Sequence, residues 1–329
     1  MIIIGLLIAL AGLFVLSFLL GRYPIPPREL CGILLGKIFP IEPFWTERME
    51  IILFNVRLPR IVLAACVGCS LAAAGAAYQG VFQNPMAAPD ILGATNGAAF
   101  GAALAILWGM SKRSITWMGF VFSLITVALV LFVSYKAKGK RILSLVLAGI
   151  MIGSLFSAGV SFIKLVADPS DQLPAITYWL MGSLAGVKLN DILFAVIPMA
   201  IGLIPLYFLR HQLNVLTLGD DEAKTMGVNV KWVRGAVIVA STLVTAASVA
   251  VSGVIGWVGL VVPHLARRLV GNNYRYLMPA SMLSGAVFLL LVDNVSRNLL
   301  AAEIPIGILT AFVGAPFFIY LITREGERY

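Results

Sequence analysis

The chain has 329 residues, of which 60% are hydrophobic and 12% are charged, and its mean hydropathy is +0.98. Soluble globular proteins are about half apolar, so this composition excludes that class and indicates a membrane protein. The net charge of +9 is typical of Lys and Arg at the cytoplasmic ends of membrane spans. Because no basic and aromatic patch accompanies it, we predict no nucleic-acid partner.

Long apolar stretches recur along the whole chain, and at about 20 residues only helices satisfy their own backbone groups in lipid. The sequence therefore predicts an all-α membrane protein of about ten transmembrane helices, in one transmembrane domain, residues 1–329. The predicted spans are residues 2–20, 58–78, 91–110, 115–135, 142–166, 192–209, 233–251, 253–270, 277–295 and 306–322.

Two polar stretches lie outside these spans. An outer segment at 21–56 is rich in proline, and a surface helix is expected at 174–184. The orientation follows from basic residues in the loops, which favour the cytoplasm. Such residues near the C-terminus and in one tight turn predict that the N- and C-termini are both cytoplasmic; they include Lys138, Lys140, Arg324 and Arg328.

The segment 216–230 interrupts the apolar sequence with a dense cluster of charge, formed by Asp220, Asp221, Glu222 and Lys224. Gly219 and Gly227 bracket about two turns of possible helix, and Ala223 and Met226 contribute to a short apolar face. A short amphipathic helix between two spans is a suitable surface for a soluble partner.

Five motifs follow one another along the chain. They are Arg57-Leu58-Pro59-Arg60, then Gln79-x3-Gln83-Asn84-Pro85-Met86, the segment 216–230, GVIGWVGLVVPHLAR at 253–267, and Asp293-x3-Arg297-x5-Glu303-x-Pro305-x-Gly307. In this order the set resembles the permease subunit of FecCD-type ABC importers, which take up iron-siderophores, haem or vitamin B12. The chain departs from the family at Gln83, where Arg is frequent, and at Tyr274, where His is frequent.

The resemblance implies that Arg57, Arg60 and Arg297 meet acidic residues of an extracytoplasmic substrate-binding protein. Arginine suits this role because it forms planar, bidentate pairs with carboxylates. The alternative is ordinary interfacial arginine that extends its charge to water. The spacing of Asp293 and Arg297, one helical turn apart, also predicts a local ion pair.

A cytoplasmic gate is a second implication of the resemblance. It assigns Asn84 and Met86, at the end of one span, and Ile142 and Leu143, at the start of another, to that gate. Met and Leu exclude water and repack at small cost. The alternative is that Pro85 only ends a helix.

The third implication concerns residues 216–230, which we call the coupling segment. The sequence has no G-x-x-x-x-G-K-[ST] motif for holding ATP phosphates, so any ATP must be hydrolysed by a separate chain. The resemblance assigns the contact with that ATPase to Leu218, Gly219, Asp220, Asp221, Glu222, Ala223, Met226, Gly227 and Val228. Leu218, Ala223, Met226 and Val228 are expected to pack, with the acidic residues as a charged rim. The alternative is a solvated loop helix.

We predict no metal, cofactor or catalytic residue. Cys66 and Cys69 form a C-x-x-C pair within an apolar run with no second ligand pair beside it. His211 and His264 lie far apart in the sequence, and for His264 we expect a hydrogen bond between helices.

The predicted function is that of a permease subunit in a binding-protein-dependent ABC importer in the prokaryotic inner membrane. The expected assembly is a homodimer with two cytoplasmic ATPases and a binding protein, carrying an iron-siderophore, haem or cobalamin-like chelate. The alternative is a secondary transporter driven by an ion gradient, which needs carboxylates or His deep within spans. The candidate carboxylates lie at or near span ends: Asp90, Asp168, Asp191, Asp293 and Glu303.

Overall fold

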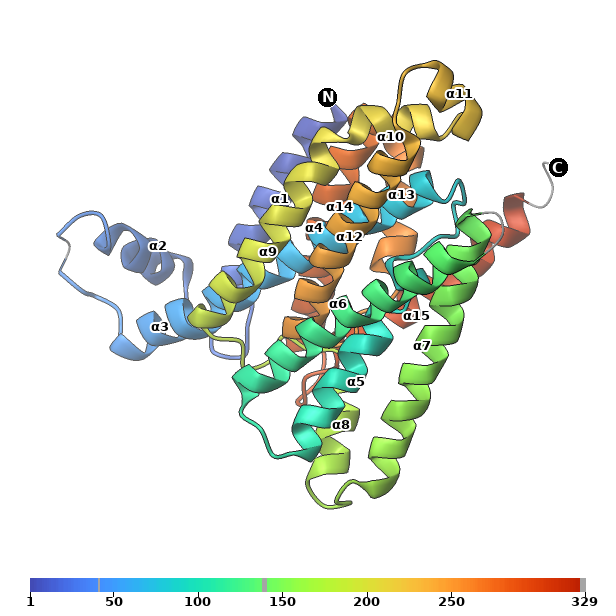
Figure 1. Ribbon diagram of the computed structural model, residues 1–329. Helices are drawn as coiled ribbons and strands as arrows, with labels where there is room; N and C mark the ends of the chain where they lie inside the picture. Colours follow the sequence, from blue (N-terminus) through green and yellow to red (C-terminus); the bar gives the residue numbers. More distant parts are fainter. Residues whose placement is uncertain (41, 138–140, 326–329) are drawn as a thin grey trace.

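The computed structural model describes residues 1–40, 42–137 and 141–325, and within these ranges every regular element is a helix (Figure 1). The elements are α1 (Ile2–Leu19), α2 (Pro27–Gly36), α3 (Glu47–Ile52), η1 (Leu53–Arg57), α4 (Leu58–Val81), η2 (Pro89–Leu92), α5 (Ala94–Leu107), α6 (Lys112–Lys136), α7 (Arg141–Val166), α8 (Gln172–Leu180), α9 (Leu189–Phe208), α10 (Arg210–Leu216), α11 (Asp220–Thr225), α12 (Val230–Ser252), α13 (Val258–Val270), α14 (Tyr274–Asn298) and α15 (Ile306–Glu325). The prediction of an all-α membrane protein is confirmed. Lys138, Lys140 and Arg328 lie outside the described residues.

Helix α4 is the centre of the bundle. It continues from α3 and η1 as one helical stretch, Glu47–Val81, and 78% of its membrane-length window is buried. A methyl group on Gly68 would overlap the backbone oxygen of Gly285 in α14, and one on Gly75 would overlap that of Gly259 in α13. Glycine is therefore required at both positions, because it lets the helix backbones touch directly.

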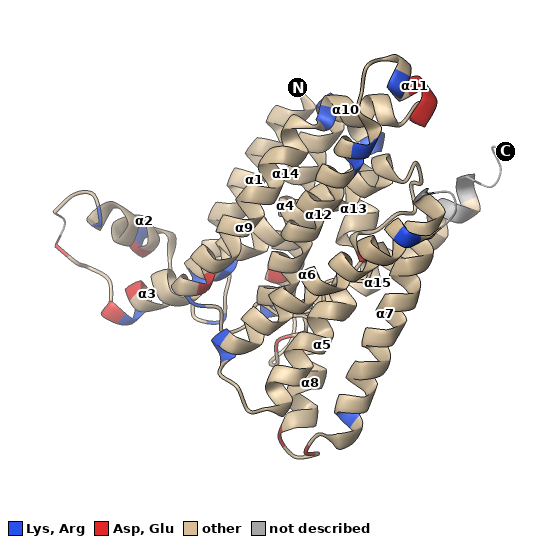
Figure 2. Ribbon diagram, viewed as in Figure 1, with Lys and Arg blue, Asp and Glu red and all other residues tan. Residues whose placement is uncertain are grey.

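The spans fall into two groups by burial. Helices α12 and α14 share the centre with α4, with 72% and 56% of their windows buried. Helices α1, α6, α7 and α9 lie around them and are only 17–28% buried. Charged residues gather toward the two ends of the bundle and on α2 and α3, while the middle of most helices is free of them (Figure 2), as expected for a chain that crosses a bilayer.

Seven of the described helical stretches are long and apolar enough to cross a membrane. The predicted spans 91–110, 253–270 and 306–322 correspond to the shorter apolar helix α5, to the 13-residue α13, and to α15. The first two are shortened by backbone breaks that hydropathy does not reveal. Gly93 has φ of 73° before α5, and Gly253 and Trp257 have φ of 67° and 69° before α13.

The two predicted polar elements are also helical. The helix expected at 174–184 is α8, at Gln172–Leu180. In the outer segment, α2 and α3 project sideways from the bundle (Figure 1). The coupling segment lies at one end, which we call the α11 end, and α8 lies at the other.

Candidate functional site

The coupling segment folds as the sequence predicts, with one short helix between two glycines. Helix α11 covers Asp220–Thr225, Gly219 forms its N-cap at φ of 130°, and Gly227 follows it at φ of 81°. Both backbone angles lie in the region that favours glycine. Leu218 and Met226 are each 61% exposed, so this end of the molecule offers two large apolar side chains to a partner.

Two residues expected to contact a partner instead pack within the chain. Ala223 is fully buried, and half-buried Val228 lies against the same hydrophobic core. The reason is the orientation of α11, which turns its small apolar side toward α10 and α12. Their packing role is therefore intramolecular, and the exposed apolar residues of the segment are Leu218 and Met226. Asp221 and Glu222 are exposed beside them.

An arginine from α12 holds the start of α11. Arg234 Nη2 and Nη1 donate to the two carboxylate oxygens of Asp220, at 2.7 and 3.1 Å, and the arginine side chain is only 4% exposed. The hydrogen bond from Arg234 is the main reason why the pKa of Asp220 is lower than that of an ordinary aspartate. Bidentate geometry of this kind fixes orientation as well as distance, so α11 cannot move freely relative to α12.

The residues assigned to a gate lie toward the α11 end, where α4 ends and α7 begins (Figure 1). Asn84 Oδ1 accepts a hydrogen bond from the backbone N–H of Met86 at 2.8 Å, which closes a tight turn. Met86 is 48% exposed and Leu143 is 56% exposed, whereas Ile142 packs partly against the core. The structure thus leaves one apolar side chain of each pair available at the surface.

The predicted docking arginines come together at the opposite end and are all buried. Arg60 Nε donates to Asp293 Oδ1 and its Nη1 to Glu303 Oε2, each at 2.7 Å. Arg297 Nε lies 3.1 Å from Asp293 Oδ2, so the predicted local ion pair is confirmed. Arg57 donates to the backbone oxygens of Phe18 and Tyr23. These groups are therefore not free charges on a rim.

They nevertheless border a cavity. A cavity of about 260 Å³ is lined by Gly21, Arg22, Tyr23, Ile52, Val56, Arg57, Arg60, Arg297 and Glu303. Sequence reasoning missed Arg22, whose Nε and Nη2 donate to the backbone oxygens of Arg297 and Leu300, both at 3.2 Å. Its position directly after the first span, against the charge bias, was the one available signal. With four arginines and one glutamate, the cavity favours an anionic group.

A second cavity, of about 390 Å³, lies between η2, α5 and α7. Its polar lining consists of a carboxylate, an amide and hydroxyl groups, from Asp90, Asn96, Ser154 and Ser157. Ser154 and Ser157 lie on the exposed face of α7, and Asn96 lies in the first turn of α5. The lining can hydrogen-bond a passing solute without binding one charge strongly.

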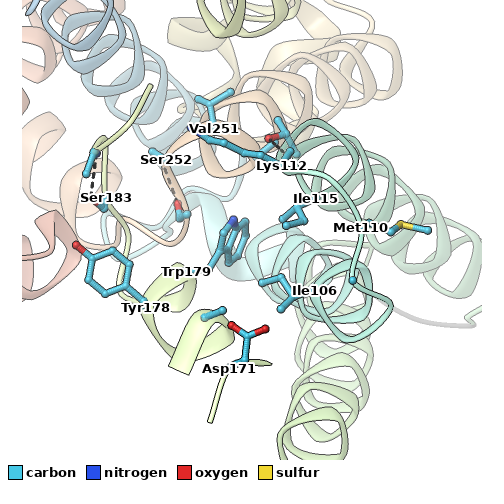
Figure 3. Close-up of a pocket in the computed structure, with 16 residues that line it drawn as sticks. Ile106, Met110, Lys112, Ile115, Asp171, Tyr178, Trp179, Ser183, Val251 and Ser252 are labelled. Carbon is cyan, nitrogen blue, oxygen red and sulfur yellow. Dashed lines mark hydrogen bonds between the residues drawn. The ribbon is translucent and has the colours of Figure 1, made fainter. Parts of the chain in front are cut away.

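A third cavity, of about 530 Å³, separates α8 from the end of α12. Figure 3 shows Trp179 beside it, with Ile106 and Ile115 on the facing side. Lys112 Nζ donates to the backbone oxygen of Gly186 at 2.5 Å, so this cation is already engaged. No His or Cys lines this cavity.

Metal ligands do not cluster in the part of the chain that the structure describes, where no three His, Cys, Asp or Glu side chains could hold an ion together. Cys31, Cys66 and Cys69 are free thiols. The two features with charge and shape for a partner are therefore the coupling segment and the arginine-lined cavity.

Comparison with known proteins agrees with this arrangement. The chain is 42% identical over 328 residues to the molybdate import system permease protein MolB of Haemophilus influenzae, which covers 99% of this chain and 97% of that one. It is 39% identical to a probable iron chelatin transport system permease protein of Helicobacter pylori, over 84% of this chain and 83% of the relative. An inward-facing structure of a metal-chelate type ABC transporter superposes with a TM-score of 0.88 at 41% identity, covering 98% of this chain and 99% of that one.

The two relatives are named for different cargoes, but both are named as permease proteins of transport systems. The model of the FecCD transport family matches residues 6–324, nearly the whole sequence. The chain belongs to the FecCD transport family and is an ABC importer permease, a multi-pass membrane protein that serves as a translocation component.

Proposed function

We propose that this permease forms a homodimer that two separate cytoplasmic ATPase subunits drive through the coupling segment. The observation that carries the proposal is α11: it presents exposed Leu218 and Met226, and Arg234 holds Asp220 rigidly against α12. A surface that is apolar at its centre and charged at its edge suits a protein partner. The chain has no ATP-binding motif of its own. In this arrangement the α11 end and both termini are cytoplasmic, and residues 1–329 act as one domain.

The opposite end would receive a substrate-binding protein. The cavity that Arg22, Arg57, Arg60 and Arg297 line carries more positive than negative charge, so an acidic side chain of the partner fits it. Arg57, Arg60 and Arg297 are buried and already bonded to carboxylates or backbone oxygens within the chain. Arg22 is therefore the arginine whose charge is most available at the mouth. The buried arginines then act by fixing the shape and potential of the cavity.

The pathway is proposed to run at the dimer axis, along the exposed face of α7 and the polar cavity beside Asn96 and Ser154. Asn84, Met86, Ile142 and Leu143 would close it on the cytoplasmic side. ATP binding and hydrolysis would shift the coupling segments and so alternate access between the two sides. Family membership leaves the gradient-driven secondary transporter without support.

A bulky metal chelate is the cargo that we propose, since relatives carry iron chelate, haem or cobalamin. Molybdate is a second candidate, favoured by the 42% identity to MolB over 99% of the chain. The cavity lining is uncharged apart from Asp90, so specificity would reside in the binding protein. Its affinities for molybdate, ferric siderophores, haem and cobalamin would separate the two candidates.

The central experiment is reconstitution of the chain in vesicles with its ATPase and binding protein. We expect uptake of the bound cargo only when ATP is present on the side of the vesicle membrane that carries the ATPase. The matched control is an ATPase variant that binds but cannot hydrolyse ATP, which should give no sustained uptake. Uptake driven by a proton or sodium gradient in vesicles that contain this chain alone would refute the proposal.

Docking is tested separately with two charge-removing variants in the same segment. Arg22→Gln removes a charge that lines the cavity, whereas Arg28→Gln removes an exposed charge of α2 that stacks on Phe44 instead. We expect Arg22→Gln to weaken binding of the binding protein and to reduce the salt dependence of association. Equal effects of both variants would indicate general charge attraction and would count against the cavity.

A further inference from the structure

The end of helix α4 is closed by a Schellman motif with an unusual residue in it. The backbone N–H of Asn84 donates to the oxygen of Gln79 at 3.1 Å, and that of Gln83 donates to the oxygen of Gly80 at 3.3 Å. This pattern places Gln83 in the left-handed position, where its φ is 50°. Glycine is the usual residue there because any β-carbon is strained. A glutamine at this point suggests that its side chain is needed.

The side chain of Gln83 makes a specific long-range contact. Its Nε2 donates to the backbone oxygen of Leu216 at 2.7 Å. Leu216 is the last residue of α10 and the first of the coupling segment. One strained residue therefore joins the turn of Asn84 and Met86 directly to the segment on which the ATPase is proposed to act.

The hydrogen bond between Gln83 and Leu216 is one of several that also connect α10 and α4 to a third helix, α14. Asn214 of α10 accepts from the backbone N–H of Tyr274 at 2.7 Å and donates to Asn273 at 2.9 Å. The hydroxyl of Tyr274 donates in turn to the backbone oxygen of Ala76 in α4 at 2.9 Å. Helices α10, α14 and α4 are thus linked in a ring, with Leu216 buried beneath it. Because these helices are hydrogen-bonded to one another, α10 cannot be displaced without also moving α4 or α14.

We propose that Gln83 is a positioning residue that transmits movement of the coupling segment to the turn at 84–86. The inference rests on the proposed function, because it requires an ATPase to act on the coupling segment. When α10 shifts, the carbonyl of Leu216 takes Gln83 with it. Asn84 is the next residue and holds the N–H of Met86, so the turn moves as a unit and the exposed side chain of Met86 changes position.

Three substitutions separate transmission from a merely structural role. Gln83→Gly removes the side chain and also relieves the left-handed strain. Gln83→Asn tolerates that conformation but is one methylene too short to reach Leu216. Gln83→Arg restores a long donor. The measurement is the ratio of cargo transported to ATP hydrolysed in vesicles that contain the complete transporter, together with its melting temperature.

We expect Gln83→Gly and Gln83→Asn to lower that ratio about 2- to 10-fold, the effect of losing one ordinary hydrogen bond, while ATP hydrolysis continues. Gln83→Arg should restore most of the ratio. Gln83→Gly should melt at the same temperature as the original chain or higher, because glycine suits the position. A merely structural role would leave the ratio of this variant unchanged, and that result would overturn the proposal.

A second measurement follows the movement itself. Spin labels at Met86→Cys and Leu218→Cys, both exposed positions, would be introduced after replacing the three native cysteines. We expect ATP to change the environment of both labels in the original background, but only of the label at 218 when Gln83→Gly is added. Movement of both labels in that variant would also overturn the inference. Absence of ATP-driven uptake by the original transporter is a different result, which would contradict the proposed function itself.

Discussion

At the scale of single residues, Met226 and Ala223 lie three positions apart in the coupling segment and have opposite environments. Met226 is 61% exposed, whereas Ala223 is fully buried. Substitution of Met226 should therefore weaken the binding of a partner, and substitution of Ala223 should lower the stability of the chain's own fold. The two positions form a matched pair for testing what the segment does.

We predict that Met226→Ser weakens binding of the ATPase about 5- to 30-fold, as expected when a central apolar contact of an interface is lost, with no change in melting temperature. Ala223→Leu should instead lower stability by about 1–3 kcal/mol because the core has no room for the added methylenes. Titration of the purified ATPase and thermal unfolding would measure the two effects. A fall in stability for Met226→Ser would contradict the assignment.

The buried ion pairs of Asp293 lead to a second prediction at the scale of single residues. It is fully buried and pairs with both Arg60 and Arg297. Removing one member of a buried ion pair leaves charges uncompensated and costs about 3–5 kcal/mol. We therefore expect Asp293→Asn to reduce the yield and melting temperature of the permease strongly, whereas Glu50→Gln, which breaks the exposed pair with Lys37, should change them little. If Asp293→Asn changed the yield and melting temperature as little as Glu50→Gln, the cluster would have no structural role.

At the scale of elements, the pair between Asp220 and Arg234 connects α11 to α12 and depends on pH. The pKa of Asp220 is lower than usual, chiefly because Arg234 donates hydrogen bonds to it. A lowered folded-state pKa means that the pair stabilises the fold above the ordinary aspartate pKa of about 4. That contribution is lost as the pH falls through the depressed value. Asp220 is partly exposed, so solvent screening limits the effect.

We expect the melting temperature of the original chain to fall more than that of Asp220→Asn between about pH 7 and about pH 3, because the variant has no carboxylate to protonate at this position. The control is Asp221→Asn, since the Asp221 side chain is 91% exposed and pairs with Lys224 one turn away. It should follow the original chain. A parallel decline for all three proteins would show that the pair does not stabilise α11.

At the scale of the whole molecule, the assembly itself can be measured. We predict that native mass spectrometry of the complex, released from detergent, gives two copies of this chain with two copies of the ATPase. Weakening the coupling segment with Met226→Ser should reduce the share of complexes that retain the ATPase and leave the pair of permease chains intact, because the proposed dimer contact lies away from the coupling segment. Recovery of single permease chains under gentle conditions would contradict the homodimer.

The sequence predicts those features of the structure that depend on residues close together in the chain, and predicts poorly those that depend on contacts between distant residues. Long apolar runs specify helices such as α6 and α7 because hydropathy and backbone pairing act locally. The glycines between 253 and 259 indicate a weakened helix there, but the start of α13 at Val258 depends on backbone angles at Gly253 and Trp257, which hydropathy does not specify. The candidate site follows the same rule: α11 was predicted from its glycines, but the inward orientation of Ala223 was not.

The arginine cluster illustrates what local sequence cannot supply. The pair of Asp293 and Arg297 follows from one helical turn. The contact of Arg60 with Glu303 joins residues 243 positions apart, and the approach of Arg22 to Arg297 spans 275. Such contacts are fixed by the packing of α1, α4 and α14 around one another. No pattern within a single span encodes them.

The division of the spans into a buried centre and an exposed ring has a consequence for the host membrane. In the proposed dimer, where the exposed face of α7 borders the pathway, the peripheral helices left to face lipid tails are α1, α6 and α9, and the largely buried α4 is shielded from them. When a bilayer becomes thinner or thicker, helices that face lipid respond by tilting, at a modest cost for each ångström of mismatch. The peripheral helices therefore absorb changes in membrane thickness, and the glycine contacts of the central helices keep their spacing. A cell could alter its acyl chains with temperature and leave the alignment of the central helices unchanged.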